Sequence, residues 1–200
     1  MRLSPNTILI STKNKDKVRE ITQKLAGLNV KINSLLDFPQ IPEVIEDGAT
    51  LEHNALKKAR TGYEATRLLT IADDTGLEVE ALDGAPGVYS SRYAGENATY
   101  ADNRRKLVEA MKDIPEGGRK AVFRTVVAII GDDIEEIVVG KCNGVITAVE
   151  QGSGGFGYDP VFLIQERNQT FAEMSLEDKN KISHRGIAVG KAVEVLKKYL

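Results

Sequence analysis

The first part of the chain alternates between strand-like and helix-like patterns of apolar residues. A β-rich run at 6–12, "NTILIST", ends in polar residues. Residues 14–28 then place apolar side chains at helical spacing, and 30–35 form a second β-rich run. The order strand, helix, strand is the usual start of an α/β sheet, so we predict a β-α-β unit here.

The pattern continues with a second helix and a third strand. Residues 50–66, "TLEHNALKKARTGYEAT", predict a helix with Thr50 as its N-cap. Residues 67–72, "RLLTIA", return as a strand. We expect this strand to stop at the two aspartates that follow it, Asp73 and Asp74. Because Gly favours turns, we expect a turn next, at Thr75-Gly76.

The second part of the chain has long apolar runs that are typical of strands. We predict two helices, at 99–114 and 183–200, and the second of them is amphipathic. We also predict three strands, at 119–131, 132–148 and 159–164, with turns at 131–133 and around Gly152. A hairpin inserted between β-α units predicts a mixed sheet. The sequence contains no internal repeat, low-complexity tract or linker.

Composition narrows the class of protein. The 200 residues suit one large domain or two tightly joined lobes, and a net charge of -2 gives no basic field for bulk nucleic acid or an anionic membrane. The single cysteine, Cys142, excludes an intramolecular disulfide and fits a packed residue in a reducing cytosol. No apolar run suits a signal peptide or a membrane span, so we predict a cytoplasmic protein.

A first candidate for ligand binding lies where the first helix begins. Asn14 is suited to cap this helix, and Lys17 falls in its first turn. A cation opposes the helix dipole at that position, and a bound phosphate would relieve the conflict. The alternative is a solvated lysine beside Asp16.

A second candidate spans residues 46–59. Asn54 and Lys58 are four residues apart and share one helix face. Glu46 and Asp47 precede the helix, where a carboxylate could reach a cation. The alternative, a plain helix with an acidic approach, is the interpretation that this segment favours when it is taken alone.

The adjacent carboxylates Asp73 and Asp74 form a third candidate. Ligands of open α/β sheets gather at the carboxyl ends of strands, where we expect this pair to lie. One carboxylate could bind Mg²⁺ while the other holds or deprotonates an attacking water. The alternative is an Asx-type turn before Gly76.

Residues 152–157, "GSGGFG", match the dinucleotide fingerprint G-x-G-x-x-G. That fingerprint requires a helix to begin there, and "YDPVFLI" instead predicts a strand. We therefore reject a Rossmann fold and interpret the loop as close backbone approach beside the flat face of Phe156. The alternative is a hairpin connection with a buried phenylalanine.

Hydrogen-bond donors gather before the last helix. Lys179, His184 and Arg185 could recognise phosphate or carbonyl oxygens, and Ser183 could cap the helix. The alternative is a charged surface loop. A zinc site, a P-loop and a nucleophile elbow are all excluded, since the ligands or motifs are missing from the sequence. The remaining groups suit hydrolysis of a nucleotide.

At these segments the chain resembles the inosine triphosphate pyrophosphatases, also called XTP/dITP diphosphohydrolases. The matching segments occur in the family's order over residues 7–190: "TKNKDKVRE", "EDGATLEHNALKKA", "ADDTGLEVEALDGAPGVYSSRYAG", "GGFGYDPVF" and "KNKISHRG". The resemblance implies Mg²⁺-dependent hydrolysis of ITP, dITP and XTP to the monophosphate and pyrophosphate. It also implies one domain over 1–200, built as two α/β lobes around a long mixed sheet with a central substrate cleft, and a homodimer.

The resemblance also implies roles for individual residues. The phosphates would lie at Thr12, Lys13, Asn14, Lys15, Asp16, Lys17 and Lys58, although Lys13 stands where glycine is common in the family. Asp74 would accept the proton from water and would also contact the metal. Glu46 and Asp73 would bind or support the metal, and Thr75 would face the substrate. The base would lie at Phe156, Gly157, Tyr158, Asp159, Lys179, His184 and Arg185.

Two rival functions remain open. One is a related house-cleaning pyrophosphatase that acts on other modified nucleotides. The other is a nucleotide-binding module without catalysis, which would bind nucleotides without turning them over.

Overall fold

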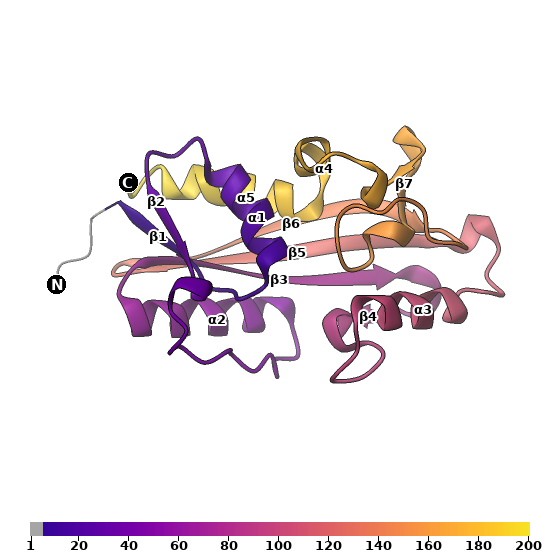
Figure 1. The fold of residues 1–200 in the computed structure, drawn as a ribbon, viewed down its shortest axis with the longest axis horizontal. Helices are drawn as coiled ribbons and strands as arrows, with labels where there is room; N and C mark the ends of the chain where they lie inside the picture. The colour runs from indigo at the N-terminus through magenta and orange to yellow at the C-terminus, as the bar shows by residue number, and fades with distance from the viewer. Residues whose placement is uncertain (1–5) are drawn as a thin grey trace. The chain divides into compact units, whose positions relative to one another are not determined.

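The computed structural model describes residues 6–200, which form a mixed α/β fold with five α-helices and one eight-stranded sheet (Figure 1). The strands follow the order β2-β1-β3-β5-β6-β7-β8, and β4 pairs with β3. The chain divides into two compact units. Unit 1 comprises the residues up to Asp74, Thr125–Gly140 and His184–Leu200, and unit 2 comprises Thr75–Arg124 and Lys141–Ser183. One domain with a central cleft stays a prediction.

Unit 1 begins with the predicted β-α-β unit. Strand β1 (Thr7–Ile10), helix α1 (Lys15–Leu25) and strand β2 (Lys31–Ser34) follow one another, and both β2 and β3 (Leu69–Val79) pair with β1 in parallel. The prediction is confirmed.

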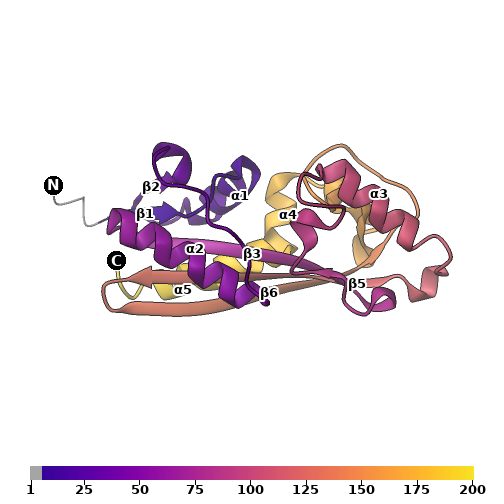
Figure 2. The same cartoon turned by 90° about the horizontal axis from the view of Figure 1, so that it is seen from below.

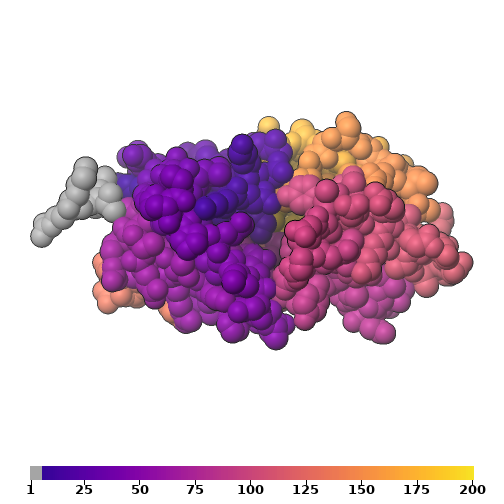
Figure 3. Space-filling view, turned by 60° about the horizontal axis from the view of Figure 1, so that its bottom comes forward, coloured from indigo at the N-terminus to yellow at the C-terminus, as the bar shows by residue number. Residues whose placement is uncertain are grey.

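Two layers of helices cover the sheet of unit 1. Helices α1 and α5 (His184–Leu196) lie on one face, and α2 (Leu51–Thr66) lies on the other (Figures 1 and 2). The core between the sheet and the first pair of helices consists of buried aliphatic residues from both layers, among them Ile8, Ile10, Ile21, Ile71, Val189 and Leu196. In the space-filling view, residues of α2 and of the loop before it cover one face of this unit (Figure 3).

Strand β3 differs from the prediction. It does not stop at the aspartates but continues to Val79, so the predicted turn at Thr75-Gly76 is wrong. The buried residues Leu77 and Val79 extend the alternating pattern, which favours a continued strand. The turn comes later, where Asp83 and Gly84 have positive φ angles of 52° and 86°. The two aspartates therefore lie within a strand and not at its carboxyl end.

A long hairpin connects strands β5 (Lys120–Gly131) and β6 (Ile134–Ile146), with the turn at the predicted position. Strand β6 pairs antiparallel with β7 (Phe162–Ile164), and β7 pairs antiparallel with β8 (Gln169–Thr170). The sheet is therefore mixed, as predicted.

Unit 2 has its own core of aliphatic and aromatic residues. Phe123, Phe162 and Phe171 pack together in it, with ring centroids 4.6, 5.1 and 6.2 Å apart. Cys142 is half-buried against this core, and burial, with a contribution from Glu166, raises the pKa of its thiol to about 11. This fits the predicted packed cysteine.

Unit 2 also contains two helices, α3 (Tyr100–Ala110) and α4 (Leu176–Ile182). The first confirms the helix predicted at 99–114, although it is shorter. The second was not predicted, because its seven residues are mostly charged and show no apolar period. The Ser175 side chain caps α4 by accepting a hydrogen bond from the Asp178 N–H. No helix within residues 6–200 is long and apolar enough to cross a membrane.

Strand β6 and helix α5 approach each other closely at Gly140. A Cβ atom at this position would lie 2.5 Å from the backbone nitrogen of Ala188 and would collide with the His184 carbonyl oxygen. Because both obstacles are backbone atoms, we expect Gly140→Ala to lower the free energy of unfolding by about 1–3 kcal/mol. Urea denaturation measures the change. Gly117→Ala is the matched control, since nothing lies within 4 Å of its added Cβ. Equal stability of both variants would contradict the close approach.

Candidate functional site

The start of helix α1 has the predicted cap. The Asn14 side chain accepts hydrogen bonds from the N–H groups of Asp16 and Lys17 at 3.0 and 3.2 Å, and the Asn14 N–H donates to Thr12 Oγ1 at 3.2 Å. Lys13 is half-buried and Lys15 is exposed. These contacts give the segment a fixed backbone at the positive end of a helix, which is an arrangement suited to phosphate.

Lys17 is not a solvated lysine beside Asp16. Its Nζ lies 3.2 Å from Asp73 Oδ2, and its side chain is 15% exposed. Asp16 pairs with Arg19 instead, at 3.5 Å. The first helical turn therefore directs its cation toward the carboxylate pair of β3.

Asp73 belongs to a buried network of charges in unit 1. Arg185 Nε lies 3.1 Å from Asp73 Oδ2, the oxygen that Lys17 also contacts, and Arg185 Nη1 lies 2.6 Å from Glu20 Oε2. Two carboxylates thus meet two cations. Burial opposes ionisation of Asp73, but the charges of Lys17 and Arg185 outweigh it and hold the pKa of Asp73 well below its usual range. The pKa of Arg185 is raised, because its carboxylate partners outweigh the effect of burial.

Asp74 belongs to a second network, formed with helix α2. Lys58 Nζ lies 3.1 Å from Asp74 Oδ1, and Asn54 Nδ2 donates to Asp74 Oδ2 at 3.1 Å. Lys58 Nζ also lies 2.5 Å from Glu46 Oε1. The predicted shared face of Asn54 and Lys58 is confirmed. Successive residues of a strand point to opposite faces, so the two aspartates meet different helices.

The surroundings of Asp74 and Glu46 shift their pKa values in opposite directions. Burial raises the pKa of Asp74, and the nearby Glu46 charge adds to this, against the opposing charges of Lys58 and Lys17. Burial would also raise the pKa of Glu46, but the charge of Lys58 outweighs this effect, and the pKa of Glu46 is lowered. The pair therefore contains one carboxyl group that accepts a proton more readily than its neighbour, the division that acid–base chemistry uses.

The carboxylate oxygens that surround Lys58 are the type of ligand that binds a hard cation. Oxygens of Glu46 and Asp74 already converge on one ammonium group. Within residues 6–200, no group of three or more His, Cys, Asp or Glu side chains is arranged to hold a metal. A metal at this place would therefore take one or two carboxylates and complete its shell with water or phosphate oxygens, which is the mode of Mg²⁺.

In unit 2, a second group of predicted residues surrounds the glycine-rich loop. Lys179 Nζ lies 2.5 Å from Asp159 Oδ2 and 5.0 Å from the centre of the Phe156 ring. The Phe156 N–H donates to the same Asp159 oxygen at 2.8 Å, and the Tyr158 hydroxyl donates to the Ser90 carbonyl at 2.9 Å. A buried ion pair and a hydrogen bond from a buried hydroxyl thus fix the C-terminal end of the loop.

The loop itself supports the sequence interpretation. Gly155 and Gly157 have φ angles of 66° and 62°, which suit glycine, and no helix begins at the loop. Rejection of the dinucleotide fingerprint is therefore confirmed. The loop joins the antiparallel strands β6 and β7, as the alternative of a hairpin connection predicts, and the Phe156 side chain is half-buried and not buried.

Two of the predicted base donors have ion-pair partners in different units. Lys179 contacts Asp159 in unit 2, whereas Arg185 contacts Asp73 and Glu20 in unit 1. His184 is buried at the first residue of α5, and Ser183 precedes it as the predicted cap would. Thr75 follows Asp74 on β3 and is half-buried. The roles of these residues toward a ligand stay predictions.

Two residues outside the predicted set contact it. Glu20 pairs with Arg185 across 165 residues of sequence, and the signal that could have found it is its place at the end of the matching segment "TKNKDKVRE". On α3, Arg104 Nη1 donates to the Gly157 carbonyl at 3.0 Å. No motif in the sequence marks Arg104.

The chain is similar in sequence to proteins of a known family. The profile of the Ham1 family matches residues 8–195. The chain is 46% identical over 194 residues to a protein of Geobacter sulfurreducens named dITP/XTP pyrophosphatase, covering 96% of each chain, and 46% identical over 190 residues to one of the same name from Desulforamulus reducens, covering 94% of each.

Solved structures of high similarity carry the same family name. A HAM1 protein from Coxiella burnetii superposes with a TM-score of 0.86 at 38% identity, covering 96% of this chain and 99% of that one. The Ham1 protein of Staphylococcus aureus superposes with a TM-score of 0.85 at 33% identity, covering 97% of this chain and 100% of that one. Because the family profile spans almost the whole chain, this protein belongs to the Ham1 family.

Proposed function

We propose that the protein hydrolyses dITP, ITP and XTP to the monophosphate and pyrophosphate with Mg²⁺, and so removes deaminated purines from the nucleotide pool. The observation that carries the proposal is Asp74, a buried carboxyl group with a raised pKa beside Lys58 and Glu46. The dITP/XTP pyrophosphatase names of relatives at 46% identity support the choice of substrate.

The phosphate end of the substrate would lie at the residues of unit 1. Lys17 and Lys58 supply positive charge, and the backbone from Thr12 to Asn14 lies at the positive end of α1. Glu46 and Asp74 would hold Mg²⁺, with Asp73 in support. The ion would neutralise charge on the triphosphate.

Asp74 would act on the attacking water. Its carboxylate accepts a proton from the water while the water oxygen forms a bond to the α-phosphorus. The bond between the α-phosphorus and the bridging oxygen of the β-phosphate breaks, and pyrophosphate leaves with that oxygen. Lys58 and Asn54 fix the carboxylate through both of its oxygens.

The base would stack on Phe156. Lys179, held by Asp159 near this ring, would donate a hydrogen bond to the base. Hypoxanthine and xanthine present O6 as an acceptor, whereas adenine presents an amino donor there. A buried polar group left unpaired discriminates strongly between ligands, so ATP should be a poor substrate.

The test is a substrate panel with Mg²⁺: ITP, dITP, XTP, GTP, ATP and modified pyrimidine triphosphates. We expect pyrophosphate release from the first three and little from ATP. Orthophosphate release would show that a different bond is cut. Preference for modified pyrimidines would support the related house-cleaning enzyme, and binding without turnover would support the non-catalytic module.

The compartment and the assembly are further parts of the proposal. We infer a cytoplasmic homodimer with no nucleic-acid or membrane partner, in line with the near-neutral net charge of -2. Analytical ultracentrifugation tests the dimer, and a monomer at micromolar concentration would contradict it.

Loss of the Phe156 ring should weaken binding of the base. Stacking on an aromatic side chain is worth about 1–3 kcal/mol per base, so Phe156→Ala should raise KM for ITP roughly 5- to 150-fold. Steady-state kinetics on ITP and XTP measure the change. Phe156→Tyr keeps the flat ring and is the control, with KM close to that of the wild type. An unchanged KM in the alanine variant would remove Phe156 from the base site.

A further inference from the structure

Two side chains of helix α3 contact the glycine-rich loop of unit 2. Tyr100 and Arg104 are four residues apart and therefore lie on one face of the helix. The Tyr100 ring centre lies 5.8 Å from that of Phe156, with the rings tilted by 48°. Arg104 Nη1 donates to the Gly157 carbonyl at 3.0 Å. One helix face thus contacts both the ring of the loop and its backbone.

On the side of Gly157, the backbone of the loop is held by a hydrogen bond from the Asp159 N–H to the Phe156 carbonyl at 3.2 Å, and the Gly157 carbonyl is the next acceptor along the chain. Glycines precede and follow Phe156, and both have φ angles in the left-handed region, 66° and 62°. Glycine loses more conformational freedom on ordering than any other residue. A charge-assisted hydrogen bond to the Gly157 carbonyl offsets part of that loss and fixes the peptide group between Gly157 and Tyr158, next to the residue that carries the ring.

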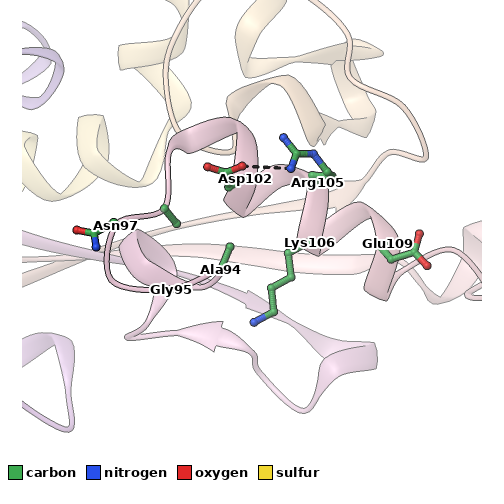
Figure 4. A pocket seen from close by; sticks show the side chains of 8 residues that line it. Ala94, Gly95, Asn97, Asp102, Arg105, Lys106 and Glu109 are labelled. Carbon is green, nitrogen blue, oxygen red and sulfur yellow. Dashed lines mark ion pairs between the residues drawn. The ribbon is translucent and has the colours of Figure 1, made fainter.

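The surroundings of Arg104 fit this task. Its side chain is 16% exposed, and its Nε forms an ion pair with Glu150 Oε1 at 2.9 Å, so an opposite charge lies beside the guanidinium. The next residue, Arg105, differs: its side chain is 75% exposed and pairs with Asp102 at 3.2 Å. Figure 4 shows Arg105 and Asp102 in the wall of a separate surface hollow of about 550 Å³.

We propose that Arg104 is a positioning residue for base recognition, acting with Tyr100 to hold the Phe156 ring in the orientation that stacks on the purine. Arg104 acts through the Gly157 carbonyl and does not itself contact the nucleotide. The inference deepens the proposed function and rests on it. It assigns part of the selectivity for the base to a helix that lies outside the segments quoted for the family resemblance.

Kinetics of Arg104→Met test the inference, because methionine keeps the length of the side chain but donates no hydrogen bond. We expect KM for ITP to rise about tenfold, the factor that one hydrogen bond of ordinary strength explains, with kcat little changed. The ratio of kcat/KM between ITP and ATP should fall. Inhibition by inorganic tripolyphosphate, which has no base, should not change.

Arg105→Met is the matched control on the same helix and should behave as the wild type. Arg104→Lys retains a cationic donor and should recover part of the lost affinity. An unchanged KM and ITP-to-ATP ratio in Arg104→Met would overturn the inference and leave the proposed function intact. Weaker inhibition by tripolyphosphate would also overturn it, since the effect would then reach beyond the base.

Hydrogen exchange measured by mass spectrometry provides a test that does not require turnover. In Arg104→Met, the peptide that covers residues 152–159 should exchange faster, while peptides of the unit 2 core should not change. Unchanged exchange in the loop would contradict the inference. If the wild type releases pyrophosphate from no nucleotide, the proposed function fails, and this measurement still decides whether Arg104 orders the loop.

Discussion

Asp74→Asn should lower kcat by about 10²- to 10⁴-fold, the range that a positioned general base contributes. Asparagine has nearly the same shape as aspartate, so it can keep one hydrogen bond to Lys58 or Asn54. It cannot accept the proton of the attacking water. The loss should therefore appear in kcat, while the nucleotide still binds. Pyrophosphate release measures kcat, and calorimetry with ITP on the inactive variant measures binding.

Asp47→Asn is the matched control for this prediction. Asp47 follows Glu46 and pairs with Lys57 on the exposed side of α2, with its own side chain 64% exposed. Its substitution removes a carboxylate close to the site in sequence without touching Asp74. Turnover should stay near that of the wild type. Turnover of Asp74→Asn within a few fold of the wild type would refute the assignment of the base.

Local patterns predicted much of the fold and those features of the site that lie within one helix. The N-caps Asn14 and Thr50 depend on neighbours two or three residues away, and both are confirmed. The shared face of Asn54 and Lys58 follows from the helical period alone, and the structure brings both to Asp74. Each of these predictions used information within one turn of a helix.

Contacts over long sequence separations could not be predicted in the same way. Arg185 reaches Asp73 across 112 residues and Glu20 across 165. Nothing near Arg185 in the sequence indicates either partner, and its role toward the base stays a prediction. The same cause explains the wrong turn at Thr75-Gly76: two adjacent aspartates end a strand in water, but here each carboxylate meets cations of a different helix layer.

Asp73→Asn should lower the free energy of unfolding by about 3–5 kcal/mol, the cost of removing one partner from a buried ion pair. Lys17 and Arg185 share one oxygen of Asp73, and the side chain of Asp73 has no exposed surface. Without the charge of Asp73, Lys17 and Arg185 would both lose this carboxylate, while Arg185 would keep its contact with Glu20. Chemical denaturation of the metal-free protein at pH 7 measures the loss.

The dependence of this loss on pH separates the charge of Asp73 from its packing. The pKa of Asp73 is lower in the folded protein than the value of about 3.9 that an aspartate has in an unfolded chain. A group of this kind stabilises the fold fully above its unfolded pKa, and the contribution is lost as the pH falls toward the folded pKa. The difference in stability between wild type and Asp73→Asn should therefore be constant from neutral pH down to about pH 5 and should narrow below about pH 4.

Glu135→Gln, which removes one side of the exposed ion pair with Arg60, is the control and should change stability little at any pH, since both side chains are about half exposed. A difference that persists unchanged into acid would mean that Asp73 stabilises unit 1 by shape and hydrogen bonding, and not by its charge.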